Sequence, residues 1–248
     1  MLVWDAATLS VLSVIGFVYG SRSFAIATWR RVAFFAALGL AVILLVGPLA
    51  HAALTDFQLH MVQHIGLMML VAPGLVLGTP GALLMQEYPA VMTRWLSSRV
   101  AKLLCTPAVG WVLFVATLFA THFSGVASLA NTSTFWHQFV LVWFLVAGLV
   151  YYYPVLNGNP LPTPTPHAHR IISLLTMMVP ETMTGFFLYA STHTIHDVRP
   201  GIDAATALHQ QQAAGALMWA AAMAIDTCWI ALAVRDWLAD EVQRAERS

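Results

Sequence analysis

The sequence predicts an all-α integral membrane protein, a bundle of seven transmembrane helices with its N-terminus outside and its C-terminus in the cytoplasm. Three observations predict this class. The chain is 59% hydrophobic and only 9% charged, with a mean hydropathy of +0.75. Long apolar runs recur along it, and the Lys and Arg residues lie almost entirely on one side of those runs. Because a soluble domain needs roughly a quarter of its residues charged to cover its surface, we expect lipid to surround this chain.

Composition and cysteine usage narrow the class further. The net charge is zero and no basic stripe occurs, so nothing supports nucleic-acid binding. Cys105 and Cys228 are too few and too far apart for a disulfide framework or a Cys-x-x-Cys metal motif. The opening MLVWDAATLS carries Asp5 in place of the basic region of a cleavable signal peptide, so we expect its apolar run to be a retained helix. The Pro-rich stretch from Asn157 to His167 is too short to mark a boundary, and residues 1–248 are predicted to form a single membrane domain.

Seven apolar runs come close to the 20 or so residues that a helix needs to cross the hydrocarbon core, the first and the fourth being short. The predicted spans are Leu2–Tyr19, Val32–Ala50, His60–Gly78, Pro107–His122, Phe135–Leu156, Ile171–His193 and Ala205–Val234. Between the third and fourth, the segment from Gly81 to Lys102 mixes apolar and charged residues. We expect it to lie along the membrane interface as an amphipathic piece.

The basic residues predict the orientation. In a seven-span arrangement ten of the 11 Lys and Arg residues fall on one side, and Arg199 alone falls on the other. The ten are Arg22, Arg30, Arg31, Arg94, Arg99, Lys102, Arg170, Arg235, Arg244 and Arg247. Because positively charged loops stay in the cytoplasm, this side is predicted to be cytoplasmic.

The histidines have the opposite distribution. Eight of the 10 lie at the predicted outer face, and only His167 and His169 lie at the cytoplasmic face. The eight are His51, His60, His64, His122, His137, His193, His196 and His209. Histidines that only capped helix ends would suit both interfaces equally. The asymmetry therefore favours a metal site, since imidazole is the commonest biological metal ligand.

The sharpest local motif is HMVQH, in which His60 and His64 are spaced i, i+4. This spacing places the two side chains on one helix face, with their Cβ atoms about 6 Å apart. Met68 continues the same stripe one turn deeper, although packing explains a methionine there equally well. The outer face has His and Met but no Cys, a set that suits Cu(I) better than zinc and an oxidising compartment better than a reducing one.

We therefore predict that His60 and His64 bind one copper ion, as Cu(I), together with His122 and at least one further histidine. The candidate metal ligands are His60, His64, His122, His137, His193 and His209.

Two acidic residues lie within predicted spans. Glu181 falls near the midplane of the sixth span, directly after Pro180, and Asp226 falls in the inner half of the seventh. Ionisable groups at such depth are costly and point to function by default. Glu181 could serve a proton or ion path or stay neutral, whereas Asp226 is expected to lie near enough to the interface to meet Arg235.

Several ordered motifs resemble the CtaG-type cytochrome c oxidase assembly factors. They are HMVQHIGLMMLVAPGLVLGTP, THFSG, FWHQF with FLVAGLVYYYPVL and a downstream PLP, and QQQAAGALMW, which together span about residues 47 to 237. The resemblance implies a seven-helix protein of the bacterial cytoplasmic (inner) membrane that supplies copper to a terminal cytochrome oxidase subunit. Matched motif by motif, it points to His60, His64, His122 and His137.

The chain departs from the family pattern at three positions. Leu141 stands where the family commonly has a second histidine one turn after His137, and His209-Gln210 stands where it tends to have Asp-Gln. Glu181 is not a residue that the resemblance leads us to expect. The set of metal ligands is therefore expected to differ in detail, with His209 a candidate replacement for an acidic ligand.

The leading hypothesis is a copper-handling protein without enzymatic activity, and two alternatives remain open. An intramembrane zinc hydrolase would need an acid beside the histidines, and Glu181 and Asp226 are expected to lie too far below them. A haem-binding electron carrier would use paired histidines on different spans. The expected partners are the membrane, the oxidase, a periplasmic copper donor or a second copy of the chain. Gly148 and Gly215 are candidates for helix contacts with such a partner.

Overall fold

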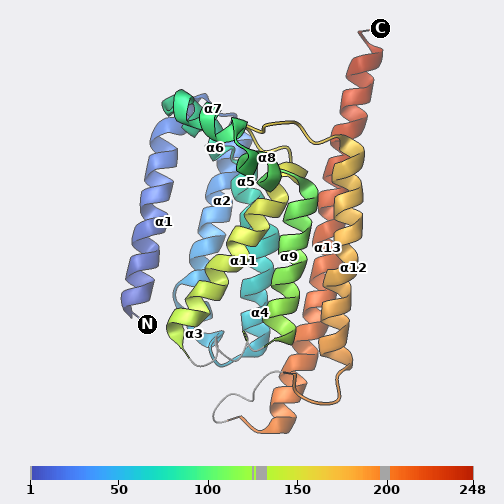
Figure 1. Ribbon diagram of the computed structural model, residues 1–248. Helices are drawn as coiled ribbons and strands as arrows, with labels where there is room; N and C mark the ends of the chain where they lie inside the picture. The colour runs from blue at the N-terminus through green and yellow to red at the C-terminus, as the bar shows by residue number, and fades with distance from the viewer. Residues whose placement is uncertain (1, 125, 127–132, 196–201, 248) are drawn as a thin grey trace.

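The computed structural model describes residues 2–124, 126, 133–195 and 202–247, and in these ranges it is helical with no strand (Figure 1). The long helices are α1 (Leu2–Arg22), α2 (Thr28–Leu45), α9 (Pro107–Phe123), α11 (Thr134–Val155), α12 (His167–Ala190) and α13 (Ala204–Ala245). A further membrane-length rod is made of α4 (Phe57–Ile65), the π-helix η2 (Gly66–Val71) and α5 (Ala72–Leu77). Shorter pieces are η1 (Ser23–Ala25), α3 (Pro48–Ala52), α6 (Pro80–Glu87), α7 (Pro89–Ser97) and α8 (Arg99–Leu104).

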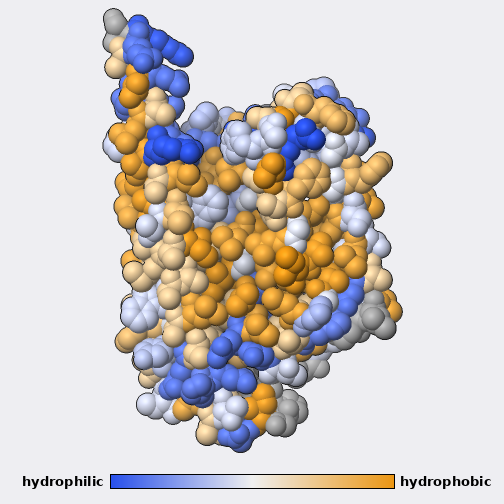
Figure 2. Space-filling view, turned by 180° about the vertical axis from the view of Figure 1, so that it is seen from behind, coloured by the Kyte–Doolittle hydropathy of each residue, from blue (hydrophilic) through white to orange (hydrophobic). Residues whose placement is uncertain are grey.

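The all-helical membrane architecture is confirmed. Among the described residues, 6 helices are long and apolar enough to cross a bilayer, and the fourth predicted span corresponds to the shorter α9, of 17 residues. In Figure 1, α9 runs alongside the longer helices, and the two chain ends lie at opposite ends of the bundle. Figure 2 shows an apolar belt between two polar ends. The count of seven spans and the outward direction of the N-terminus stay predictions.

Two boundaries differ from the sequence prediction for local reasons. The second span was expected to continue to Ala50, but α2 ends at Leu45, because Gly47 adopts a φ of +84° and Pro48 cannot donate a helical hydrogen bond. The last helix, α13, continues to Ala245, well past the expected end at Val234, and projects beyond the rest of the bundle (Figure 1). The segment from Gly81 to Lys102 folds into parts of α6, α7 and α8 at that same end.

The rod formed by α4, η2 and α5 lies at the centre of the bundle, with 67% of its span buried against 11% for α1. Pro73 interrupts its hydrogen-bond ladder, because the missing N–H would have donated to the carbonyl of Met69. The indole Nε1 of Trp229 on α13 donates to that carbonyl instead, at 3.1 Å. A neighbouring helix thus satisfies the backbone group that proline leaves open, as a lipid-embedded helix requires.

Small residues allow the helices to approach one another inside the bundle. A Cβ on Gly148 would lie 2.6 Å from the Met68 carbonyl oxygen, and one on Gly215 would lie 2.5 Å from the Tyr189 nitrogen. Both glycines therefore serve contacts within this chain, of α11 with η2 and of α13 with α12. The expectation that they meet a partner is wrong, since both are already covered.

The two ends of the bundle differ in composition. We call the end that contains the start of α4, the end of α9 and the start of α11 the histidine end. The opposite end, with α6 to α8, the start of α12 and the end of α13, is called the basic end (Figure 1). The ten basic residues that predicted the orientation belong to the helix ends and connections there.

Candidate metal centre

Four of the predicted ligands meet at the histidine end. The ring centroids of His60 and His64 are 4.0 Å apart, those of His60 and His137 5.0 Å, and those of His64 and His122 5.8 Å. The side chains come from α4, α9 and α11, and each is buried, with 2–7% of its surface exposed. We call these four residues the histidine cluster. Three separate helices thus contribute to one continuous row of imidazoles.

The local sequence fixes the position of each ring. Asp56 caps α4 by accepting hydrogen bonds from the backbone N–H groups of Gln58 and Leu59, at 2.8 and 3.1 Å. This cap starts the helix just before His60, and the i, i+4 spacing then stacks His64 one turn further along the same face. His122 occupies the last turn of α9 and His137 the first turn of α11. The ends of these two helices therefore bring their histidines to the depth of α4.

The ring of His122 is oriented by its own helix. Its Nδ1 lies 2.8 Å from the carbonyl oxygen of Leu118, which can only accept, so Nδ1 carries the proton. In the neutral ring the lone pair then belongs to Nε2. A backbone carbonyl that fixes the tautomer in this way is the usual support of a metal-binding histidine. His64 is held differently, by stacking on Phe144 with a centroid distance of 4.0 Å.

A small cavity adjoins the cluster on its inner side. It offers about 20 Å³ to a water-sized sphere, which is room for one water molecule. Its walls include His64, His122, Glu181 and four methionines. The methionines are Met61, Met68, Met69 and Met218. Imidazole nitrogens and thioether sulfurs therefore border the same space, and these are the ligand types that Cu(I) accepts.

The side chains do not form a preassembled chelate. In the described ranges, no three His, Cys, Asp or Glu residues are grouped so that they could hold a metal ion as they stand. The imidazoles contact one another through their rings, at interplanar angles of 65° for His60 with His64 and 86° for His64 with His122. The cluster is thus compact, but rotation of its side chains would have to precede shared coordination.

The remaining histidines lie in other surroundings. His193 and His209, also predicted as ligands, are exposed, unlike the buried cluster. His51 pairs with Asp5 at 2.7 Å, and His196 lies outside the described residues. At the basic end His167 pairs with Asp240 at 2.8 Å. The sequence predicted how far along the bundle axis these residues lie. That position alone does not bring a side chain into contact with the cluster.

Two expectations about the buried acids are wrong. Glu181 was expected to lie too far below the histidines to reach them, yet it lines the same cavity as His64 and His122. Asp226 was expected near Arg235, but that guanidinium pairs with Asp236 at 3.0 Å. Asp226 instead interacts with Glu181 inside the bundle. The nine residues that separate Asp226 from Arg235 amount to about 13 Å along a helix, too far for direct contact.

Both carboxyl groups are closed off from solvent, with exposures of 1% for Glu181 and 0% for Asp226. A charged side chain at the centre of a membrane helix costs about 2.5–3.5 kcal/mol on insertion scales. Among the described residues no Lys or Arg forms a salt bridge with either acid. The pair is therefore an unusual feature that packing alone does not explain.

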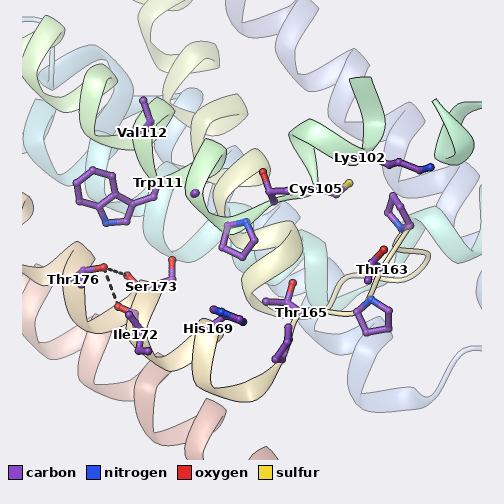
Figure 3. Close-up of a pocket in the computed structure, with 16 residues that line it drawn as sticks. Lys102, Cys105, Trp111, Val112, Thr163, Thr165, His169, Ile172, Ser173 and Thr176 are labelled. Atoms are coloured by element: carbon purple, nitrogen blue, oxygen red, sulfur yellow. Dashed lines mark hydrogen bonds between the residues drawn. The ribbon is translucent and has the colours of Figure 1, made fainter. Parts of the chain in front are cut away.

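A much larger pocket, of about 710 Å³, opens at the basic end between α8, α9, the loop of residues 162–166 and α12 (Figure 3). Its walls are mainly apolar and include Trp111, Val112 and Ile172, with Ser173 and His169 among the polar residues. The Cys105 thiol also borders it, and burial raises the pKa of this thiol. Its size falls in the range of small-molecule pockets, but it lies at the opposite end from the histidine cluster.

Two buried glutamines were missed by the sequence reasoning. Gln63 donates to the carbonyl oxygen of Leu44 at 2.6 Å and so ties α4 to the end of α2. Gln211 accepts from the backbone N–H of Ile195 at 2.8 Å and donates to the carbonyl of His193 at 3.3 Å, which fixes the chain that follows α12. Both glutamines lie within motifs that carried the family resemblance, and these motifs could have pointed to them.

Comparison with known proteins gives distant relatives. Uncharacterized proteins of Mycobacterium bovis and Mycobacterium tuberculosis are each 29% identical over 150 residues, and one of Mycobacterium leprae is 27% identical. These alignments cover 56% of this chain but only 23% of each relative, so the chain spans a small part of their length. No solved structure gives a significant match.

A family match covers nearly the whole described bundle. The family of cytochrome c oxidase caa3 assembly factors matches residues 14–240, a range that includes the histidine cluster, the π-helix and the two buried acids. The family resemblance predicted from the HMVQH motif and those that follow it is therefore confirmed. The chain belongs to the CtaG family of cytochrome c oxidase caa3 assembly factors.

Proposed function

We propose that the histidine cluster binds copper as cargo, in the form of Cu(I), at the periplasmic face of the membrane, and that the protein passes it to a cytochrome oxidase during assembly. The observation that carries the proposal is the row of four buried imidazoles from three helices, with centroids 4.0–5.8 Å apart. Membership of the assembly-factor family supports a cytochrome oxidase as the recipient of the copper.

The surroundings of the cluster suit a soft, exchangeable ion. Methionines line the adjoining cavity, and thioethers bind Cu(I) but have little affinity for zinc. The rings are packed rather than locked in a chelate, so the ligands can rotate onto an ion and release it again. A closed thiolate site would hold copper more tightly and hand it over less readily.

The position of the cluster suits transfer at the membrane. It lies at the end of the bundle, where a periplasmic donor could approach, and α9 and α11 carry two of its histidines at their termini. Since the described residues are mainly membrane-length helices, we expect them to contact the oxidase helix to helix. The exposed aromatic side chains of α11, such as Trp136 and Phe139, offer one such surface.

One observation supports the zinc-hydrolase alternative and another opposes it. Glu181 shares a cavity with His64 and His122, as a general base beside a metal would. The cavity, however, has room for only one water molecule and none for a substrate. The haem alternative has the same difficulty, because rings 4.0–5.8 Å apart leave no space for a macrocycle between them.

Metal analysis of variants tests the binding site. The protein is purified without chelator from cells grown with copper, and its copper content is measured by elemental analysis. The double variant His60→Ala/His64→Ala should lose its copper, whereas His167→Ala/His169→Ala, which alters two histidines at the basic end, should keep it. Circular dichroism must show that both remain helical. Full copper occupancy in the first variant would refute the site, and bound zinc in place of copper would refute the cargo.

The physiological role needs a separate test. A strain that lacks the protein should have low cytochrome oxidase activity at limiting copper, and added copper should partly restore it. The His60→Ala/His64→Ala variant should fail to complement this strain, while the basic-end variant should complement it. Normal oxidase activity in the deletion strain at limiting copper would overturn the role even if the purified protein binds copper.

A further inference from the structure

The buried acids Glu181 and Asp226 belong to a longer series of polar groups inside the bundle. On α11 the hydroxyls of Tyr151 and Tyr152 are both fully buried, at 0% exposure, and both lie within electrostatic range of the two carboxyls. Neither hydroxyl and neither carboxyl has a hydrogen-bond partner of good geometry in the described part of the chain. Four buried polar side chains thus face a common interior region.

This series continues to the pocket at the basic end. The Tyr151 hydroxyl lies close to that of Ser173, and Ser173 lines the 710 Å³ pocket. Figure 3 shows the Ser173 side chain directed from α12 toward the wall that Trp111 forms. Ser173 and Glu181 are eight residues apart on α12, about 12 Å along the helix, and both side chains are buried in the bundle. Polar atoms therefore extend from the open pocket to the carboxyl pair.

At its other end the pair faces the small cavity beside the histidine cluster. The ionisable groups that approach it are His64 from α4, His122 from α9, the two tyrosines from α11, and the partner acid on the facing helix. The surface of the small cavity is apolar apart from these groups, and this cavity has a volume of only about 20 Å³, whereas the basic-end pocket, of about 710 Å³, has room for many water molecules. Water therefore has better access to the pair through Tyr151 and Ser173.

We propose that Glu181 and Asp226 share one proton and exchange it with water in the basic-end pocket through the hydroxyls of Tyr151 and Ser173. Two adjacent carboxyls in lipid without a cation cannot both be ionised, and one proton between them leaves a single charge. The proton moves from the protonated carboxyl to the hydroxyl or an intervening water, which passes its own proton on toward the pocket. No bond between heavy atoms forms or breaks.

The shared proton and its route do not depend on copper binding, whereas their use in charge exchange rests on the proposed cation site. A buried site that gains or loses a cation must exchange other charge, or a net charge would remain inside the bundle. A proton route from the centre of the membrane to the basic end provides that exchange. The same route would serve whichever cation the histidine cluster takes up.

Infrared spectroscopy of the full-length protein in lipid nanodiscs tests the shared proton. At neutral pH the wild type should show the carbonyl band of a protonated carboxyl group, and the band should shift down after transfer to D2O. Glu181→Gln/Asp226→Asn should abolish the band, and Glu87→Gln, which alters an exposed acid at the basic end, should leave it unchanged. Absence of the band in the wild type, or its persistence in the double variant, would overturn the proposal.

The route is tested by the rate of the shift in D2O. Tyr151→Phe and Ser173→Ala should each slow it, whereas Tyr153→Phe on the same helix should not, because the Tyr153 hydroxyl donates to the carbonyl of Pro160 outside the series. Exchange at the wild-type rate in Tyr151→Phe would refute the route. Thermal unfolding is compared for every variant. Where the double variant fails to fold, each single variant must shift the carboxyl band, since removal of one acid forces the proton onto the other.

Discussion

The histidine cluster and the basic end both contain buried histidine or arginine side chains, but the neighbours of these side chains differ. At the basic end His167 pairs with Asp240 at 2.8 Å, and Arg170 pairs with Asp236 at 3.3 Å. At the histidine end the four rings of the cluster lie against one another, and His64 also stacks on Phe144. The residues that surround a histidine therefore indicate a metal site better than the number of histidines at that end does.

This difference in neighbours explains why the histidine end is a candidate metal site and the basic end is not. At the basic end both ring nitrogens of His167 are engaged, Nε2 by Asp240 at 2.8 Å and Nδ1 by the guanidinium of Arg170 at 3.4 Å, so this ring has no nitrogen left for an ion. In the histidine cluster, imidazoles from three helices have centroids 4.0–5.8 Å apart, so that several of them could turn onto one ion. If the two ends differ in this way, replacing histidines at one end should affect copper binding far more than replacing them at the other.

The strongest test replaces single rings at each end. His122→Phe should lower copper affinity at least about tenfold, the scale on which even supporting groups of metal sites act. His169→Phe, in the pocket of the basic end, should leave the affinity unchanged. Competition with a Cu(I) chelator gives both values. Equal affinities for the two variants would mean that the ends do not differ in metal binding.

A second test removes the buried cation at the basic end. Arg170 is 4% exposed and donates to the carbonyl of Val155 at 2.6 Å as well as pairing with Asp236. Arg170→Met should lower the free energy of unfolding by about 1.5–3 kcal/mol, the usual value of a hydrogen bond from a charged group. Arg235→Met removes an exposed partner of the same Asp236 and should cost about 0.5 kcal/mol or less. Copper affinity should not change in either, and chemical denaturation in detergent compares their stabilities.

A smaller effect is expected from the cap that positions the cluster. Asp56→Ala removes the acceptor for the N–H groups of Gln58 and Leu59 and should cost about 1 kcal/mol. Because the first turn of α4 carries His60, hydrogen exchange should become faster there and copper affinity should fall slightly. Asp203→Ala removes the corresponding cap of α13 and should change exchange only at that helix. Faster exchange in α4 with Asp203→Ala would contradict this local effect.

The smallest effect concerns the thiol at the basic end. Since burial raises the pKa of Cys105, its thiolate should form at higher pH than that of a free thiol. Alkylation of Cys105, followed by mass spectrometry of the peptide, should therefore be slow at neutral pH and should increase at higher pH than alkylation of glutathione under the same conditions. A rate that matches glutathione at every pH would show that the pocket is more open than its walls suggest.

Much of the fold followed from the sequence because it depends on local properties. The lengths of the apolar runs predicted the membrane helices, and Pro48 could have corrected the end of α2. The i, i+4 spacing of His60 and His64 already required two adjacent rings, since that distance is set by the helix itself. The ordered motifs predicted the family, and the family match confirmed it.

The tertiary structure decided which of the remaining residues meet. His122, His137, His193 and His209 were all predicted at one depth, yet only the first two lie in the buried cluster. Glu181 and Asp226 were judged separately, and they form a pair. Counting residues gives height along a helix, because each residue adds 1.5 Å. It does not give the direction in which a side chain points around the helix axis relative to its neighbours, and that direction is fixed only when helices distant in sequence pack together.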